Sequence, residues 1–290
     1  MDKEKKPAAA YEMLDVDDKV YFDGLTAQKS IKDLKKLKNS NSPFFLAVGF
    51  VKPHLPFTAP KKYWDLYKES DIQLPKQNIF PESAPNQANH QWGELRRYKD
   101  IPKKGPIDHE MSKTLIHAYY ASVSYVDAQI GKLLNALDSF GLRDSTIVVL
   151  VGDHGWSLLE HGLWAKHSNF EVALHVPMII SATNFPVNVK TNSIAELVDI
   201  FPTLCELTIG PKPKHLQGTS LVSSMRNPEK IIKTTALARW RRGETLIHND
   251  FFYTEWNLQS GRISRMLYDH SNDPCLLYTS DAADDVLGGG

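Results

Sequence analysis

Short apolar runs and amphipathic stretches alternate along this chain. Two of the runs are typical of short strands buried on both faces, residues 42–50 and 146–151. Apolar residues at spacings of three and four predict helices at residues 25–39, 109–140 and 193–207. A further strand is expected at residues 176–182. This order of elements predicts an α/β sheet with helices on both of its faces.

The two longest predicted helices have recognisable inner faces. In residues 25–39, Ile31, Leu34 and Leu37 are expected to point inward, and the lysines of this stretch are expected to face solvent. The inner face of the helix at 109–140 is expected to consist of Leu115, Tyr119, Val123, Val126, Ile130, Leu133 and Leu137. Gly141 is expected to end that helix.

The pattern changes after residue 213. Short alternating runs there predict four strands, at residues 234–240, 245–248, 251–256 and 266–268. Asn249-Asp250 predicts a tight turn between the middle two. Earlier in the chain, residues 68–108 are rich in Pro, Asn and Gln and show no periodicity, which predicts a long loop; loops of this length are usually functional or mobile.

Composition narrows the class of protein. The 290 residues are 42% hydrophobic and 10% aromatic, enough for a core in one large domain with an appendage. The 34 basic residues balance the 34 acidic ones, so charge gives no reason to expect a nucleic-acid partner. No apolar stretch approaches the roughly 18 residues that span a bilayer, so no membrane partner is expected. Of the two cysteines, Cys205 is predicted to be a small buried hydrophobe.

Chemically active side chains follow the apolar run at 146–151. Asp153 and His154 stand between Gly152 and Gly155, where a carboxylate oxygen and an imidazole nitrogen can be offered to a divalent cation. Lys166, thirteen positions after Asp153, adds a fixed positive charge suited to an anionic group lying against a metal. The alternative is structural, with Asp153 capping a turn and His154 packed beneath it.

A histidine also follows the first apolar run. His54 lies between Pro53 and Pro56, which fix the backbone and stiffen the loop around it. A solvent-facing histidine on a Pro-rich loop is the alternative interpretation.

Taken together, these segments resemble the sulfatase family of the alkaline phosphatase superfamily, and most of all its iduronate-2-sulfatase-like branch. The resemblance covers residue 15 to about residue 274. It is carried by five segments in the same order as in the family, residues 44–57, 120–131, 152–166, 175–179 and 267–274. The fold that it implies is a sulfatase-like sheet with helices on both faces, lacking its N-terminal part, plus a smaller and incomplete C-terminal antiparallel sheet.

The resemblance also implies roles for individual residues. Asp153 and His154 would be two ligands of a single calcium ion, Lys166 would contact the sulfate, and His54 would contact the sulfate and protonate the leaving alcohol. Members of the family use a formylglycine made from Cys or Ser in a C/S-x-P-x-R motif, and this motif is absent from the 290 residues. The formylglycine and the remaining calcium ligands are therefore expected in a missing N-terminal segment.

The same comparison predicts how the chain is organised. Residues 1–213 are expected to be a catalytic domain truncated at its N-terminus, residues 214–274 an incomplete C-terminal subdomain, and residues 275–290 a non-native tail. Asp17 and Asp18 have no apolar strand before them, so they are expected to be solvated loop carboxylates rather than metal ligands.

The leading hypothesis is a sulfuric ester hydrolase that acts on sulfated carbohydrate, such as a uronate 2-sulfate. The 290 residues alone are expected to be inactive, and the full-length parent to be secreted, periplasmic or lysosomal. Two alternatives stay open, a phosphomonoesterase or phosphodiesterase of the same superfamily and a noncatalytic glycan-binding relic. His90, Trp92, Arg96 and Arg97 are candidates either for sugar contacts or for surface packing. Residues 239–242, Arg-Trp-Arg-Arg, are expected either to contact a sulfated glycan or to form a salt-bridge cluster on the rim.

Overall fold

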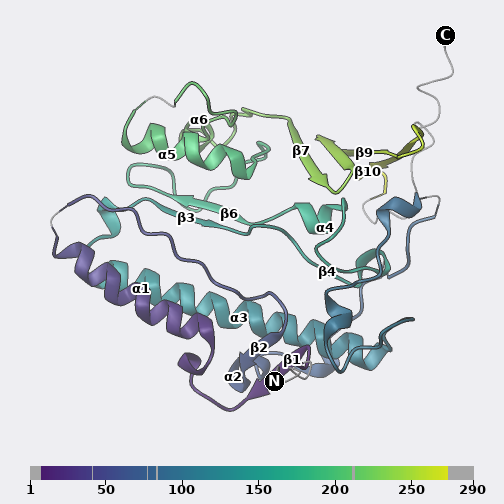
Figure 1. Ribbon diagram of the computed structural model, residues 1–290. Helices are drawn as coiled ribbons and strands as arrows, with labels where there is room; N and C mark the ends of the chain where they lie inside the picture. Colours follow the sequence, from purple (N-terminus) through teal and green to yellow (C-terminus); the bar gives the residue numbers. More distant parts are fainter. Residues whose placement is uncertain (1–7, 41, 77, 83, 211–212, 274–290) are drawn as a thin grey trace, which may run out of the picture. The chain divides into compact units, whose positions relative to one another are not determined.

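The computed structural model describes residues 8–40, 42–76, 78–82, 84–210 and 213–273 (Figure 1). They form two compact units. The first consists of the described residues of Met1–Lys76 and Trp92–Thr146, and the second consists of those of Gln77–Gln91 and Ile147–Gly290. This division does not test the predicted domain boundary at residue 213, which stays a prediction, and the predicted non-native tail at 275–290 lies outside the described residues.

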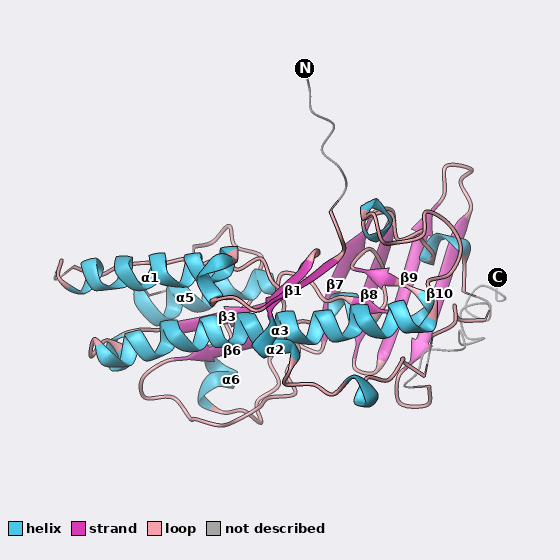
Figure 2. Ribbon diagram, turned by 90° about the horizontal axis from the view of Figure 1, so that it is seen from below, coloured by secondary structure: helices cyan, strands magenta, loops and turns pink. Residues whose placement is uncertain are grey.

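Two long helices dominate the first unit, and they lie side by side in both ribbon views (Figures 1 and 2). α1 (Phe22–Lys38) and α3 (His109–Ser139) confirm the predicted helices. The side chain of Asp108 accepts a hydrogen bond of 2.8 Å from the Met111 amide and so caps the start of α3. Gly141, with φ of 67°, follows its end as predicted.

The inner face of α3 differs in part from the prediction. Leu115 and Val126 are buried, but Val123 is 39% exposed. The buried positions include three polar residues that the apolar pattern did not indicate, Ser112, Ser122 and Gln129. The helix is therefore packed over a wider and more polar face than its apolar stripe.

The rest of the first unit is built from short elements. β1 (Tyr11–Leu14) pairs in parallel with β2 (Phe57–Pro60), and α2 (Lys61–Trp64) follows β2 directly. Within the described residues of the long loop predicted at 68–108, the helical elements are three single 3₁₀ turns, Glu69–Asp71, Asn86–Ala88 and Leu95–Arg97.

The strand predicted at 42–50 is absent. Its burial alternates between half-buried and exposed positions from Phe44 to Phe50, and Phe45 is 83% exposed. No strand among the described residues pairs with it, so an extended, apolar segment is left without a hydrogen-bonded ladder.

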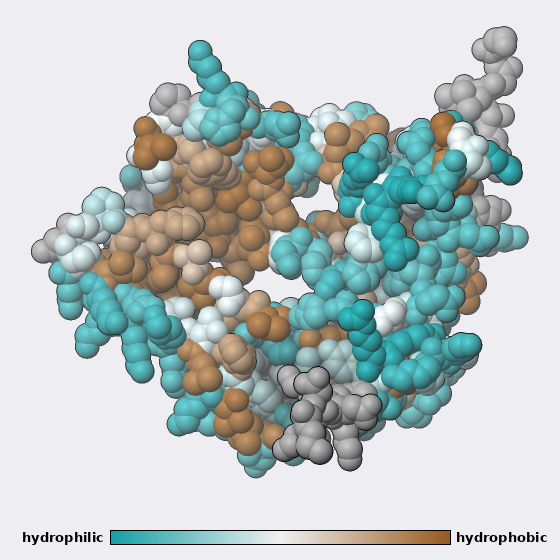
Figure 3. Space-filling model, viewed as in Figure 1, coloured by the Kyte–Doolittle hydropathy of each residue, from teal (hydrophilic) through white to brown (hydrophobic). Residues whose placement is uncertain are grey.

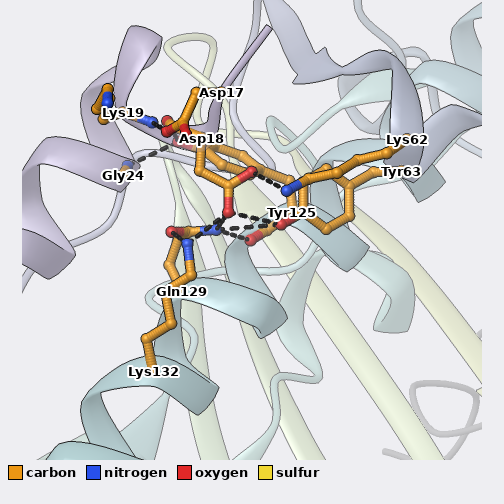
Figure 4. Close-up of polar contacts among 9 residues, drawn as sticks. All are labelled: Asp17, Asp18, Lys19, Gly24, Lys62, Tyr63, Tyr125, Gln129 and Lys132. Carbon is orange, nitrogen blue, oxygen red and sulfur yellow. Dashed lines mark hydrogen bonds and ion pairs between the residues drawn. The ribbon is translucent and has the colours of Figure 1, made fainter. Parts of the chain in front are cut away.

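The prediction that Asp17 and Asp18 are both solvated is wrong for Asp18. Asp17 accepts a hydrogen bond of 3.0 Å from the Lys19 amide and caps the 3₁₀ turn Asp18–Val20. The side chain of Asp18 instead enters the interior of the first unit, where the residue is only 5% exposed (Figure 4).

Four side chains from α2 and α3 satisfy the buried Asp18 carboxylate. Lys62 Nζ lies 2.8 Å from one oxygen, and the other oxygen accepts from Tyr63 at 2.9 Å, from Gln129 at 3.2 Å and from Lys132. Burial by itself would raise the pKa of Asp18, but these hydrogen bonds outweigh it and lower the pKa to about 2. The carboxylate thus links the start of α1 to α2 and α3.

In the second unit, β3 (Val148–Val151) pairs with β6 (Met178–Ser181), and the two run antiparallel. Val151 is 38% exposed and Ile179 is 58% exposed, so the prediction of a strand buried on both faces is wrong. No further strand within the described residues covers this pair. Figure 3 shows apolar side chains gathered on the exposed surface around β3, β6 and α5 (Ile200–Thr208).

α5 begins seven residues later than the predicted helix at 193–207. A 3₁₀ turn, Leu197–Asp199, precedes it, and the residues before that turn are not helical. The Ser193 hydroxyl accepts from the amides of Ile232 and Lys233, at 3.0 and 3.4 Å. These hydrogen bonds to a distant segment replace the helical ladder that the periodicity predicted.

The C-terminal part of the second unit is a four-stranded antiparallel sheet in the order β10-β9-β8-β7, which confirms the predicted smaller sheet (Figure 2). Its strands are β7 (Thr235–Trp240), β8 (Gly243–His248), β9 (Phe251–Asn257) and β10 (Ile263–Asp269). Asn249, with φ of 50°, and Asp250 form the predicted two-residue turn between β8 and β9.

Short elements complete the second unit. They are β4 (Ser157–Leu158), β5 (Trp164–Ala165), α4 (Glu171–Leu174) and α6 (Val222–Arg226). Cys205 is buried as predicted. Among the helices of the described residues, none combines the length and the apolar character needed to cross a membrane.

Candidate active site

Asp153 and His154 lie just past the end of β3, as the sequence predicted. The Gly152 amide donates to the Pro177 carbonyl at 3.1 Å, which extends the pairing of β3 and β6 by one residue. Asp153 then turns outward, and its side chain is 90% exposed. One of its oxygens accepts from the His154 amide at 3.0 Å.

The ring of His154 is oriented by its neighbour. Its Nδ1 lies 2.8 Å from the Gly155 carbonyl oxygen, which can only accept, so Nδ1 carries the proton. Nε2 lies 3.7 Å from the second oxygen of Asp153, and in the neutral ring it carries the lone pair that a metal can use. The two side chains thus place an oxygen and a nitrogen that can both bind a metal 3.7 Å apart.

Gly155 is required by a close approach to α4. Its amide donates to the Ala173 carbonyl at 2.9 Å, and the Trp156 amide donates to the Val172 carbonyl at 3.0 Å. A Cβ added to Gly155 would lie 2.0 Å from the Val172 carbonyl oxygen. Any larger residue would therefore push the Asp153-His154 loop off α4.

Lys166 meets the same loop through Trp156. Its Nζ lies 5.3 Å from the centre of the Trp156 ring, and the His154 ring centre lies 6.2 Å from that of Trp156. Trp156 is only 7% exposed, so its buried ring is a fixed contact surface for Lys166 and His154. The structure therefore brings His154 of the predicted metal-ligand pair and the predicted sulfate-binding Lys166 to one indole, Trp156, which the sequence pattern did not single out.

The fourth predicted residue, His54, lies in the first unit. Its Nδ1 is 2.7 Å from the Leu55 carbonyl and its Nε2 is 2.9 Å from a carboxylate oxygen of Glu94. Both ring nitrogens therefore lie within hydrogen-bond distance of oxygen acceptors, which fixes the orientation of the ring. Glu94 was missed because it lies in the aperiodic loop, forty residues away.

Buried charges hold the backbone around His54. The carboxylate of Asp23, which is 1% exposed, accepts from the amides of Val51 and Lys52 at 2.9 and 2.8 Å. The Lys52 ammonium donates to the carbonyls of His54 at 3.1 Å and Pro56 at 2.5 Å. Burial lowers the pKa of Lys52 to about 8, and Asp23 opposes this shift only in part.

A calcium ion fits this arrangement only in part. The ion prefers roughly six to eight oxygen ligands, and Asp153 and His154 supply one carboxylate and one nitrogen. In the part of the chain that the structure describes, no three His, Cys, Asp or Glu side chains come together as a metal site. The pair can form one side of a metal site, and the rest of the ligands must come from elsewhere.

The candidates for sugar contacts in the 68–108 loop are distributed over both units. The Arg96 guanidinium lies 4.4 Å from the centre of the Trp92 ring and donates to the carbonyls of Pro102 and Gly105, both at 2.6 Å. These contacts hold the loop. His90 lies in the second unit with its ring centre 6.2 Å from that of His167, and burial lowers its pKa to about 4.

The similar proteins reported next carry the word sulfatase in their names. The family model described as "Sulfatase" matches residues 3–211. Iduronate 2-sulfatase of Homo sapiens is 42% identical over 200 residues, which are 67% of this chain and 36% of that protein. A sulfatase of Formosa agariphila is 32% identical over 82% of this chain and 46% of its own length. The chain thus spans less than half the length of these relatives.

Solved structures show the fold. One, a protein in complex with its substrate D-glucosamine-2-N,6-O-disulfate, has a TM-score of 0.77 and 20% identity, and the match covers 91% of this chain and 66% of that one. The phosphonate monoester hydrolase of Agrobacterium radiobacter has a TM-score of 0.77 and 23% identity, over 97% of this chain and 61% of that one. These matches confirm the predicted fold class.

Proposed function

The chain belongs to the sulfatase family, and we propose that the whole protein hydrolyses sulfate monoesters of carbohydrates. The observation that carries this proposal is the placement of Lys166 and His154 against Trp156, with Asp153 beside them at the end of β3. A fixed cation next to a pair of metal-ligand side chains suits an anionic ester. The names of the similar proteins, iduronate 2-sulfatase and sulfatase, support the same chemistry.

Lys166 would bind the sulfate group. Its ammonium lies over a buried indole, which limits its movement, so it would stabilise charge on the sulfate oxygens without first having to reorganise. Sulfate esters have poor leaving groups when the alcohol is a sugar. A proton donor for the ester oxygen is therefore needed as well.

His54 would be that donor. Its Nε2 lies 2.9 Å from Glu94, and a proton carried by this nitrogen would pass to the ester oxygen as the bond between that oxygen and sulfur breaks. Glu94 and the Leu55 carbonyl would keep the ring oriented during the transfer.

Asp153 and His154 would hold one calcium ion through a carboxylate oxygen and Nε2. When bound, this ion would draw electron density from the sulfate group. The proposed nucleophile is a formylglycine. Since the C/S-x-P-x-R motif does not occur among the 290 residues, no residue described here provides it.

Hydrolysis of phosphate or phosphonate esters is the second candidate. The fold match to the phosphonate monoester hydrolase of Agrobacterium radiobacter favours it, because the fold alone does not separate the two chemistries. Lys166 and a metal would bind either anion.

The test uses the full-length enzyme with nitrophenyl sulfate, nitrophenyl phosphate and a phenyl phosphonate ester. We expect kcat/KM to be highest for the sulfate, and to fall on the order of a hundredfold or more in Lys166→Ala. Lys190→Ala, which removes an exposed lysine of the same unit, is the matched control and should change it less than twofold. Faster turnover of a phosphorus ester would establish the second candidate. Binding of sulfated sugars with no turnover of any ester would indicate a noncatalytic protein.

A further inference from the structure

The segment that carries Lys166 is attached to the tip of the β7–β8 hairpin. The ring of His167, the next residue, stacks on Trp240 with centres 4.6 Å apart and planes inclined by 17°. The Asn169 side chain donates to the Gly243 carbonyl at 3.2 Å and to the Thr245 hydroxyl at 2.9 Å. Both sides of the hairpin tip are therefore held against the residues that directly follow Lys166.

The tip itself is tightly built. Trp240 pairs with Gly243 in the ladder, so Arg241 and Arg242 form a two-residue turn, and Arg241 adopts φ of 53°. A Cβ added to Gly243 would lie 2.4 Å from Trp256 Nε1 and 2.9 Å from the Asn169 side-chain oxygen. Gly243 thus allows the turn to lie close to Trp256 and Asn169, and the two arginines project from a tightly packed hairpin.

The arginines of this hairpin are not equivalent. Arg239 lies 3.5 Å from Glu244, so the predicted salt-bridge interpretation holds for this residue. Arg241 and Arg242 are exposed, and no acidic side chain within the described ranges forms an ion pair with either one. The guanidinium of Arg241 lies 5.5 Å from the centre of the Trp240 ring, a cation–π distance that steadies it against the ring on which His167 stacks.

The charge at the tip is therefore positive and comes mainly from arginine. Burial lowers the pKa of His90 to about 4, with smaller electrostatic contributions from His167 and Arg241, so His90 is neutral at pH 7. Guanidinium groups bind carboxylates and sulfates through two parallel hydrogen bonds, which a lysine cannot offer.

We propose that Arg241 and Arg242 form a second anion-binding subsite beside Lys166. The subsite receives a carboxylate or a second sulfate on the same saccharide whose sulfate ester is hydrolysed, so the substrate class is a saccharide with at least two anionic groups. This inference rests on the proposed role of Lys166 in binding the reacting sulfate.

The test compares Arg241→Gln, Arg242→Gln and the double variant with Arg239→Gln in the full-length enzyme. Four sugars are assayed beside nitrophenyl sulfate: a uronate 2-sulfate, its carboxyl-reduced form, a glucosamine disulfate and the corresponding monosulfate. For the preferred dianionic sugar, we expect the double variant to lower kcat/KM relative to nitrophenyl sulfate by at least tenfold, mainly through KM. Arg239→Gln should change this ratio less than twofold.

The substrate pairs identify the second anion. A loss confined to the uronate, with its carboxyl-reduced form unaffected, assigns the subsite to a carboxylate, and a loss confined to the disulfate assigns it to a second sulfate. An unchanged ratio in the double variant would overturn the subsite. If the wild-type enzyme hydrolyses no sulfate ester, the proposed function fails. Calorimetric binding of the same sugars to wild-type and double-variant protein then decides the subsite alone, with equal affinities counting against it.

Discussion

Replacing Asp18 by Asn tests whether the buried carboxylate stabilises the first unit. The substitution keeps the size of the side chain and removes its charge. Tyr63 can still donate to the amide oxygen, but Lys62 and Lys132 lose the anion that they share. The sequence around Asp18 indicates a solvated turn. The loss of unfolding free energy in Asp18→Asn therefore measures the stabilisation by the buried contacts of Asp18, which the sequence does not indicate.

The size of the effect follows from the pKa. Burial opposes ionisation, yet the hydrogen bonds from Lys132, Lys62, Tyr63 and Gln129 lower the pKa of Asp18 from an ordinary 3.8 to about 2. At about 1.4 kcal/mol per pH unit, the folded state gains about 2 kcal/mol from the ionised carboxylate. Both lysines are roughly half exposed and can be solvated when the anion is removed, so we expect Asp18→Asn to lose about 2 kcal/mol rather than the ~3–5 kcal/mol of a fully buried pair.

The direction in which Asp18 changes the free energy of unfolding with pH follows from its lowered pKa. A carboxyl group whose pKa is lower in the folded state contributes stability above its unfolded pKa and loses it as the pH falls through its folded pKa. The difference in the free energy of unfolding between wild type and Asp18→Asn should therefore be full above about pH 5 and shrink between about pH 4 and pH 2.

Urea unfolding of the 290-residue chain at several pH values, followed by tryptophan fluorescence, measures this difference. Asp17→Asn is the matched control. Asn caps a helical turn as well as Asp does, so this neighbour should cost less than about 0.5 kcal/mol. The reasoning would be refuted by equal losses in the two variants, or by a loss in Asp18→Asn that stays constant down to pH 2.

Three further predictions concern the chemistry of the full-length enzyme and of this chain. His54→Ala should lower turnover of sugar sulfates on the order of a hundredfold. Nitrophenyl sulfate has a good leaving group, so it should restore turnover in His54→Ala more than in Lys166→Ala. Equal restoration in both variants would argue against His54 as the acid. Asp153→Asn should remove most of the activity and most of the bound calcium, measured by atomic emission. Asp127→Asn on α3 should retain both. A full calcium content in Asp153→Asn would exclude Asp153 as a ligand. The 290-residue chain should release no sulfate from an aryl sulfate above a His54→Ala background, because it lacks the nucleophile motif, and clear turnover would reveal another nucleophile.

Sequence alone located the elements whose ends are set locally. Asp108 and Gly141 fix the two ends of α3 through a side-chain cap and a positive φ, and Asn249 fixes the turn between β8 and β9 in the same way. The paired side chains Asp153 and His154 were found because residue types at the end of an apolar run are themselves local information.

What the sequence could not give depends on distant partners. The burial of Asp18 requires Lys62 and Lys132, which are 44 and 114 positions away, and nothing near Asp18 indicates them. The apolar residues 44–50 have strand propensity, but a strand also needs a neighbour, and the described residues do not supply one. Glu94 reaches His54 from a loop without periodicity, so only the three-dimensional structure pairs them.

The small C-terminal sheet supports the candidate site as well as the proposed subsite. Trp156 precedes β4, Lys166 follows β5, and the Asp153-His154 loop is hydrogen-bonded to α4 through Gly155 and Trp156. These elements of two to four residues are too short to be stable by themselves.

Two contacts anchor these elements to the sheet. His270, just past β10, lies 3.2 Å from Glu171 on α4 and is the main cause of the lowered pKa of that carboxyl, while Asn169 is bound to the start of β8. Since α4 in turn holds the amides of Gly155 and Trp156, the position of the Asp153-His154 loop depends on a sheet more than eighty residues later in the chain. The sheet is thus part of the framework that orients the site. Substitutions in the sheet that shift α4 should therefore also shift the Asp153-His154 loop.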